Sequence, residues 1–148
     1  MIKQISINTK FGWISAFETN GKIFKIKFGK LGKQKTSKIL EEFNKNLNKF
    51  FEKKTSYIKA PHKMTGNRTQ KKVWNQLKKI KVGKTKSYGE IARKYKLSPR
   101  YVGKICSQNK LLLLVPCHRV IKTDGSLGGF SSVGGVKLKK KLLEFEKN

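Results

Sequence analysis

The residues best suited to covalent chemistry stand together in one short motif, Pro116-Cys117-His118-Arg119-Val120. A cysteine reacts as its thiolate, and neighbouring positive charge favours that form. Arg119 can supply such charge, and His118 can either supply it or relay a proton. We therefore predict that Cys117 is a nucleophile in a polar, cationic pocket.

The segments on either side of the motif must position this thiol. Residues 111–115 are uniformly apolar, which favours a buried strand-like segment leading into Cys117. After the motif, residues 127–132 are dense in glycine, so they can form either the thin wall of a pocket or an ordinary surface connection. In the last predicted helix, Glu146 falls close to the apolar face, where it either orients a histidine or solubilises the helix end.

Upstream of the motif, two short helices begin at recognisable caps. Ser87 and Glu90 form a Ser-x-x-Glu capping box, and Ser98-Pro99 gives an N-cap followed by proline at the first helical position. Such a pair indicates a helix-turn-helix, which presents its second helix to DNA. Cys106 is expected on the buried face as a small hydrophobe. The residues expected to face outward toward phosphates are Arg100, Tyr101, Gly103, Lys104 and Ser107.

The N-terminal part is predicted to be a small β-rich unit. Residues 11–17 and 22–28 favour two strands, and Asn20-Gly21 between them is a strong hairpin signal. In the second strand, the apolar members of the alternation are Phe24 and its neighbours at positions 26 and 28. Ser37 then opens a helix with one apolar face.

The boundary between the two parts is predicted within residues 53–67, which contain proline and glycine and show no periodicity. We therefore expect two domains, 1–60 and 61–148. Beyond the boundary, Val73, Leu77 and Ile80 form the stripe of a further helix.

The charge of the chain calls for an anionic partner. Lys and Arg total 36 against 8 Asp and Glu, which gives a net charge of +28. Nucleic acid is the natural counterpart of such a surface. The alternative is a lineage bias, since most of the excess is lysine, and AT-rich genomes raise lysine content everywhere.

Cysteine usage and hydropathy predict an intracellular, soluble protein. The 2 cysteines and 2 histidines show no zinc-ligand spacing, so no metal site is expected. A thiol kept free for chemistry fits a reducing compartment. No signal-peptide core and no membrane-spanning apolar run are evident. We expect a cytoplasmic protein, associated with the nucleoid if the source is prokaryotic.

The Cys117 motif, the capped helix pair with Arg100, the glycine-rich loop and Glu146 form one set. In order and spacing, this set closely resembles the O6-alkylguanine-DNA alkyltransferases, also called methylated-DNA–protein-cysteine methyltransferases. The resemblance is firm over residues 66–148, and residues 1–65 are only compatible with it. It implies an α+β fold with a ribonuclease H-like N-terminal lobe carrying one helix. The C-terminal lobe would be winged-helix-like and contain the helix-turn-helix.

The resemblance also implies a repair protein that acts once. It would flip O6-alkylguanine out of double-stranded DNA and transfer the alkyl group irreversibly to Cys117, as a monomer without a cofactor. In this comparison, His118 takes the thiol proton through a water and Glu146 orients His118. Tyr88 donates a proton to the leaving guanine, and Asn109 holds the bend before the active residue.

Further residues are assigned by the same resemblance. Arg100 would fill the space vacated in the base stack. The pocket for the flipped base would include Arg119, Val120, Phe130 and Ser131. Phe130 stands where many family members have tyrosine, and the loop at 131–135 is longer than usual.

Two other functions compete with this hypothesis. A non-catalytic lesion-binding protein of the alkyltransferase-like class would bind damage without accepting the alkyl group, but that class lacks the cysteine. A basic nucleic-acid-binding module with a structural Cys117 would explain the charge. It would leave Tyr88, His118 and Glu146 without a role.

Overall fold

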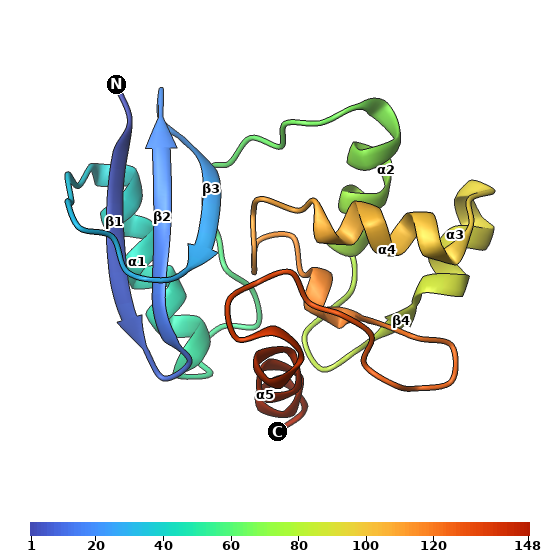
Figure 1. Ribbon diagram of the computed structural model, residues 1–148. Helices are drawn as coiled ribbons and strands as arrows, with labels where there is room; N and C mark the ends of the chain where they lie inside the picture. The colour runs from blue at the N-terminus through green and yellow to red at the C-terminus, as the bar shows by residue number, and fades with distance from the viewer. The chain divides into compact units, whose positions relative to one another are not determined.

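The computed structural model describes residues 1–148, and its elements belong to the α+β class (Figure 1). The chain divides into two compact units. The N-terminal unit comprises residues 1–65 and 110–114, and the C-terminal unit comprises residues 66–109 and 115–148. No helix combines the length and the apolar character needed to cross a membrane.

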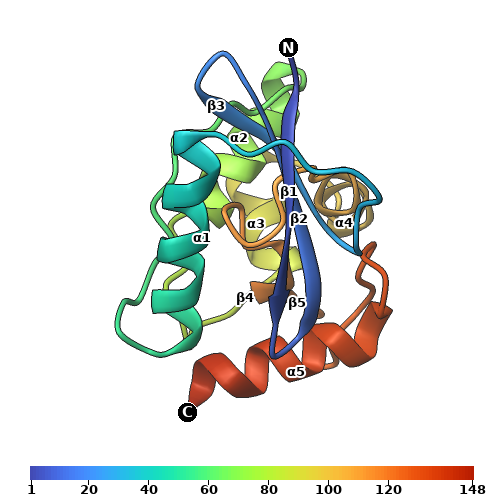
Figure 2. The same ribbon diagram turned by 90° about the vertical axis from the view of Figure 1, so that its left-hand side faces the viewer.

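The N-terminal unit is an antiparallel sheet with one helix packed against its three strands. The strands β1 (Lys3–Thr9), β2 (Gly12–Thr19) and β3 (Lys22–Phe28) pair in that order, and α1 (Lys38–Phe51) contacts all of them (Figures 1 and 2). Ser37 caps α1 as predicted, because its hydroxyl accepts a hydrogen bond from the Leu40 amide at 3.2 Å. The core of this unit lies between the sheet and α1 and is formed by Ile5, Ile7, Ile14, Ala16, Ile26, Phe28, Leu40, Phe43 and Leu47.

The predicted hairpin at Asn20-Gly21 is confirmed. Both residues have positive φ, 51° and 78°, as a tight turn between twisted strands requires. The predicted alternation in β3 is wrong at Phe24. Phe17 pairs with Lys25 and Glu18 pairs with Ile23, so Phe24 is left out of register in a β-bulge. The bulge turns Ile23 into the core and leaves Phe24 half-buried.

The division into units differs from the predicted boundary after residue 60. The free edge of β3 pairs with two segments from beyond that boundary. The Ile23 amide donates to Pro61 O at 2.9 Å, and the Ile26 amide donates to Lys110 O at 2.8 Å. These backbone hydrogen bonds tie both segments to the N-terminal sheet.

The C-terminal unit is built from four helices and a two-stranded parallel pair. Its helices are α2 (Arg68–Leu77), α3 (Tyr88–Tyr95), α4 (Pro99–Ser107) and α5 (Gly135–Lys147) (Figure 1). The short strands β4 (Lys86–Ser87) and β5 (Val120–Ile121) pair with each other.

Local capping explains where these helices begin. The predicted Ser87–Glu90 capping box and the Ser98 N-cap are both confirmed. The helix α2 has a capping box of its own, Asn67 with Gln70, and ends at Leu77, so Ile80 is buried in the following turn rather than in the helix.

The apolar run at 111–115 is buried but does not form the predicted strand. Only isolated bridges occur there, and Leu113 has φ +73°, which turns the chain. The run also contributes to both units, because residues 111–114 belong to the N-terminal unit and Val115 to the C-terminal one. Cys117 is therefore presented by a 3-10 turn, η1 (Cys117–Arg119), instead of a strand end.

Candidate active site

A cavity of about 710 Å³ opens in the C-terminal unit, and Cys117 forms part of its wall. One side of the cavity is the helix α4, and the other is the glycine-rich loop after β5. The lining residues are Tyr88, Pro99, Arg100, Gly103, Cys106, Ser107, Cys117, Lys122, Thr123, Gly128, Gly129, Phe130 and Ser131.

The predicted site residues fall into three groups. Those that line the cavity are Cys117, Tyr88, Arg100, Gly103, Ser107, Phe130 and Ser131. Tyr101 and Lys104 are exposed on α4 but do not line it. Those that are buried outside the lining are Asn109, His118, Arg119, Val120 and Glu146.

Arg119 and Val120, which are predicted to belong to the substrate pocket, do not line this cavity. The Val120 side chain is fully buried, and Arg119 is held by an ion pair with Glu146 on α5. Cys106 is buried on α4 as predicted, and it also lines the cavity. Its helical spacing from Pro99 and Gly103 (i, i+4, i+7) would have placed all three on one face of α4.

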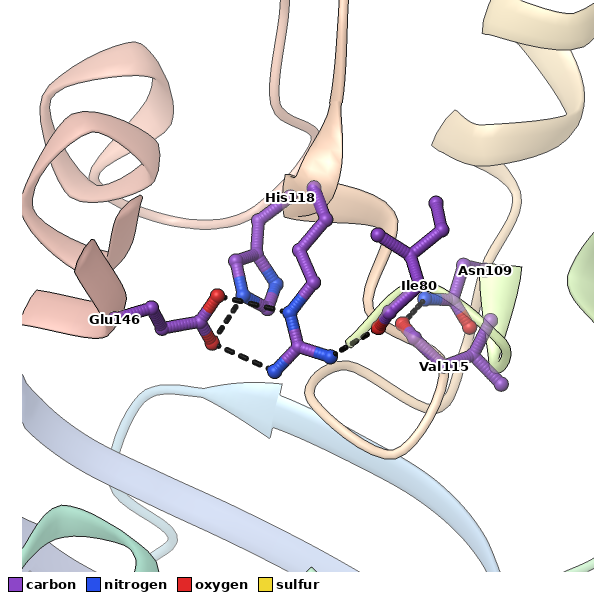
Figure 3. Close-up of polar contacts among 6 residues, drawn as sticks. Ile80, Asn109, Val115, His118 and Glu146 are labelled. Atoms are coloured by element: carbon purple, nitrogen blue, oxygen red, sulfur yellow. Dashed lines mark hydrogen bonds and ion pairs between the residues drawn. The ribbon is translucent and has the colours of Figure 1, made fainter. Parts of the chain in front are cut away.

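His118 and Arg119, which follow Cys117 in the chain, form a buried cluster with Glu146 of α5 (Figure 3). Glu146 Oε2 accepts hydrogen bonds from His118 Nε2 and Arg119 Nη2, both at 2.8 Å. Glu146 Oε1 accepts from Arg119 Nε at 2.8 Å. The fourth contact runs from Arg119 Nη1 to Ile80 O at 2.7 Å. The carboxylate thus has partners on both of its oxygens.

The charges in this cluster have clear physical causes. Burial alone would raise the pKa of Glu146, but hydrogen bonds from Arg119 and His118 outweigh it and lower that pKa to about 2. Burial lowers the pKa of His118, Glu146 acts against this shift, and Arg119 and Lys139 add to it. At neutral pH the cluster therefore contains a carboxylate, a guanidinium and a neutral imidazole.

The environment of Cys117 is set by burial and by two polar neighbours. Burial raises the pKa of the thiol, while a hydrogen bond from the Asn109 side chain and the positive charge of Lys139 lower it. Asn109 Nδ2 also donates to Val115 O at 2.8 Å (Figure 3). The Cys117 amide donates to the same oxygen at 2.8 Å. Asn109 thus fixes the bend that presents the thiol.

Lys139 is a site residue to which the sequence interpretation gave no role. It is fully buried, and its ammonium donates to Val120 O at 2.7 Å, Leu127 O at 2.6 Å and Gly129 O at 3.1 Å. Its fourth and longest contact is to Tyr88 Oη at 3.3 Å, which shares one of the three N–H donors with a carbonyl oxygen. Its signal in the sequence is a lysine beside Leu138, on the face of α5 that also carries Leu142 and Glu146.

Tyr88 lies between two glycines, one on α4 and one on the loop. A Cβ on Gly103 would come within 3.9 Å of the Tyr88 ring, and a Cβ on Gly128 would come within 3.1 Å of it. Burial, together with nearby Cys106 and Cys117, raises the pKa of Tyr88 to about 12. The phenol stays protonated at neutral pH, and because its oxygen accepts from Lys139, its own proton is free to be donated.

Comparison with known proteins identifies relatives of this chain. Residues 68–148 match the family described as 6-O-methylguanine DNA methyltransferase, DNA binding domain. A methylated-DNA–protein-cysteine methyltransferase of Metallosphaera sedula is 36% identical over 149 residues, covering 99% of this chain and 94% of that protein. Another, from Saccharolobus islandicus, is 38% identical over 115 residues, covering 78% of this chain and 74% of that protein.

The fold of this chain is also similar to that of solved structures. The structure of Mycobacterium tuberculosis OGT in complex with DNA superposes with a TM-score of 0.87 at 27% identity, covering 97% of this chain and 92% of that one. The chain belongs to the methylated-DNA–protein-cysteine methyltransferase family.

Proposed function

We propose that this protein repairs O6-alkylguanine in double-stranded DNA by transferring the alkyl group irreversibly to Cys117, once per molecule. The observation that carries the proposal is that Cys117 opens into the same cavity as Arg100 and Gly103 of α4. A thiol sealed in the core would have no path to a base, whereas this one faces a cavity walled by the candidate DNA-binding helix.

The transfer is a direct displacement that needs no metal or cofactor. The Cys117 sulfur attacks the alkyl carbon, the carbon–O6 bond breaks, and guanine leaves with the bonding electron pair. His118 accepts the thiol proton through a water, since its Nε2 is engaged by Glu146. Tyr88 donates a proton to the departing guanine, and the ammonium of Lys139 stabilises the phenolate that results.

DNA would be engaged through the α3–α4 pair as a helix-turn-helix. Arg100 fills the space left by the flipped base, and the exposed Tyr101 and Lys104 contact the backbone beside it. Phe130 and Ser131 would contact the extruded base, because both line the cavity opposite α4. The M. tuberculosis protein was solved in complex with DNA, which supports DNA as the partner of this chain.

The finer features of fold and setting belong to the same proposal. We infer a ribonuclease H-like N-terminal lobe from its three antiparallel strands followed by a helix. We infer a winged-helix-like C-terminal lobe from its capped helix pair and the short β4–β5 pairing. The protein would act as a monomer on DNA in the cytoplasm, at the nucleoid in a prokaryote.

The test is intact-mass measurement after incubation with a duplex that contains O6-methylguanine. A single methyl equivalent, mapped to Cys117 and not increasing with excess substrate, is expected. The Cys117→Ala variant should bind the duplex without gaining mass. Binding by the wild type without any mass change would instead support the non-catalytic lesion-binding protein. Indifference to the lesion would support a general nucleic-acid-binding module.

A further inference from the structure

Arg119 is the one buried charged group near Cys117 that the proposed reaction does not use. It neither lines the cavity nor lies on a surface that DNA could reach. We propose that Arg119 is a positioning residue, which locks the Glu146 carboxylate and thereby holds His118 in the tautomer whose Nδ1 is free to accept a proton. This inference rests on the proposed function.

The geometry of the carboxylate carries the first step. Arg119 donates from Nε to Oε1 and from Nη2 to Oε2, both at 2.8 Å, so the guanidinium binds the two oxygens of Glu146 as a fork (Figure 3). Rotation of the carboxylate would break both bonds at once. The remaining donor Nη1 is tied to Ile80 O at 2.7 Å, which anchors the fork to the turn after α2.

Oε2 of Glu146, which contacts both Arg119 and His118, determines which nitrogen of the imidazole carries the proton. Oε2 of Glu146 also meets His118 Nε2 at 2.8 Å, and an ionised carboxylate can only accept hydrogen bonds. Nε2 must therefore carry the proton. In a neutral imidazole the other nitrogen, Nδ1, is then the acceptor, which is the form that a general base requires.

The third step concerns the charge of His118. The groups that act on its ring are Glu146 and Lys139 from α5 and Arg119 from η1. Glu146 favours the protonated ring, whereas Arg119 and Lys139 oppose it. Without Arg119, less positive charge would oppose the effect of Glu146, so the pKa of His118 would rise. The ring would then be protonated at higher pH and could no longer act as a base.

Only arginine fits this role at the position. Lysine would keep the positive charge but would offer a point charge instead of a planar fork with several donors. An Arg119→Lys variant therefore separates the geometric contribution from the electrostatic one, and Arg119→Met removes both. Arg68, exposed at the start of α2, provides a matched control as Arg68→Met.

The activity test is the pH dependence of single-turnover transfer to an O6-methylguanine duplex. Arg119→Met should move the acidic limb of the rate to higher pH, by on the order of one pH unit. Arg119→Lys should lower the rate at every pH with a smaller shift of the limb, and Arg68→Met should match the wild type. If Arg119→Met lowers thermal stability but leaves the limb in place, the role is merely structural and the proposal is overturned.

A second measurement requires neither alkyl transfer nor the Arg119→Met variant. The chain has 2 histidines, so in a His62→Gln background the ring nitrogen NMR signals belong to His118 alone. The wild-type ring should be protonated at Nε2 and bare at Nδ1, and Arg119→Lys should show a mixture of tautomers. A wild-type ring protonated at Nδ1 would overturn the inference even if alkyl transfer occurs. The expected tautomer without any transfer would overturn the proposed function instead.

Discussion

Lys139 occupies a site that disfavours its type, since its ammonium is fully withdrawn from water. Burial lowers its pKa, and the nearby Cys117 and Cys106 act against that shift. What holds the residue there is a set of carbonyl oxygens from β5 and from the loop that walls the cavity. One side chain thus ties together the segment after Cys117, the loop and Tyr88.

Replacing Lys139 by methionine should therefore weaken both the cavity and the fold. Three backbone carbonyls lose their donor, and each buried acceptor left without a partner costs about 1–3 kcal/mol. We expect a fall in unfolding temperature together with a loss of transfer of at least about tenfold. Lys140→Met, at the exposed neighbouring position, is the matched control and should change neither. Equal effects of the two substitutions would contradict this role.

The buried cluster makes a separate prediction about stability and pH. The pKa of Glu146 is lowered to about 2 in the fold, so its contribution is present above its ordinary value of 4.5 and is lost as pH falls toward 2. The pKa of His118 is also lowered, so stability starts to fall once pH drops below its ordinary value of 6.5. Both groups weaken the fold on acidification.

Denaturant unfolding between pH 7 and pH 2 tests this directly. Glu146→Gln should be less stable than the wild type at pH 7, by up to about 3 kcal/mol. The gap should narrow as pH falls through the range from 4.5 toward 2. A gap that stays constant over the whole range would show that ionisation of Glu146 does not support the fold.

At the scale of elements, the reactive geometry depends on α4 and the loop after β5 holding Tyr88 between them. Gly103 faces one edge of the ring, and Gly128 faces the other. Gly128 also has φ +73°, a conformation that side chains disfavour. The loop can approach Tyr88 only because this position lacks a Cβ.

The substitution Gly128→Ala should displace either Tyr88 or the loop. The added Cβ would lie 3.1 Å from the ring carbon Cε2 and 3.2 Å from the hydroxyl. Small misplacements of catalytic groups are costly, so we expect transfer to slow on the order of tenfold to a hundredfold. Gly129→Ala is the control, because its Cβ would meet no atom within 4 Å and its φ is not positive. If both variants transfer at the wild-type rate, the loop does not constrain Tyr88.

At the scale of the whole molecule, the dominant property is charge. The chain carries 36 basic against 8 acidic residues, and one of the few acidic side chains, Glu146, is buried in the cluster. The exposed charged side chains are therefore mostly cationic. Such a surface is suited to sequence-independent attraction to DNA, with recognition of the lesion left to the cavity.

This surface charge predicts a steep dependence of DNA binding on salt. Affinity for an undamaged duplex, measured between 50 and 200 mM salt, should fall by roughly three orders of magnitude or more if several phosphates are neutralised. Lys104→Gln on α4 should reduce the logarithmic slope by about 1, whereas Lys45→Gln, exposed on α1, should not. A flat salt response would show that the lysine excess reflects genome composition rather than binding.

Features encoded by neighbouring residues could be predicted from the sequence alone. The motif at Cys117, the caps at Ser37, Ser87 and Ser98 and the hairpin at Asn20-Gly21 depend on side chains within a few positions of one another. Even there, periodicity failed where the backbone departed from regular geometry. The apolar residues around Phe24 and Leu113 follow the pattern of a regular strand, but the backbone forms a bulge at Phe24 and a turn at Leu113.

Only the tertiary structure revealed the partners of the buried charges and the wall of the cavity. Arg119 meets Glu146 across 27 positions of the chain, and Lys139 meets Tyr88 across 51. Sequence spacing carries no information about such pairs, because they form only when η1, α3 and α5 are packed together. For the same reason the sequence predicts Arg119 in the pocket, whereas the packed helices place it on Glu146, and the buried Cys106 also borders the cavity of Cys117.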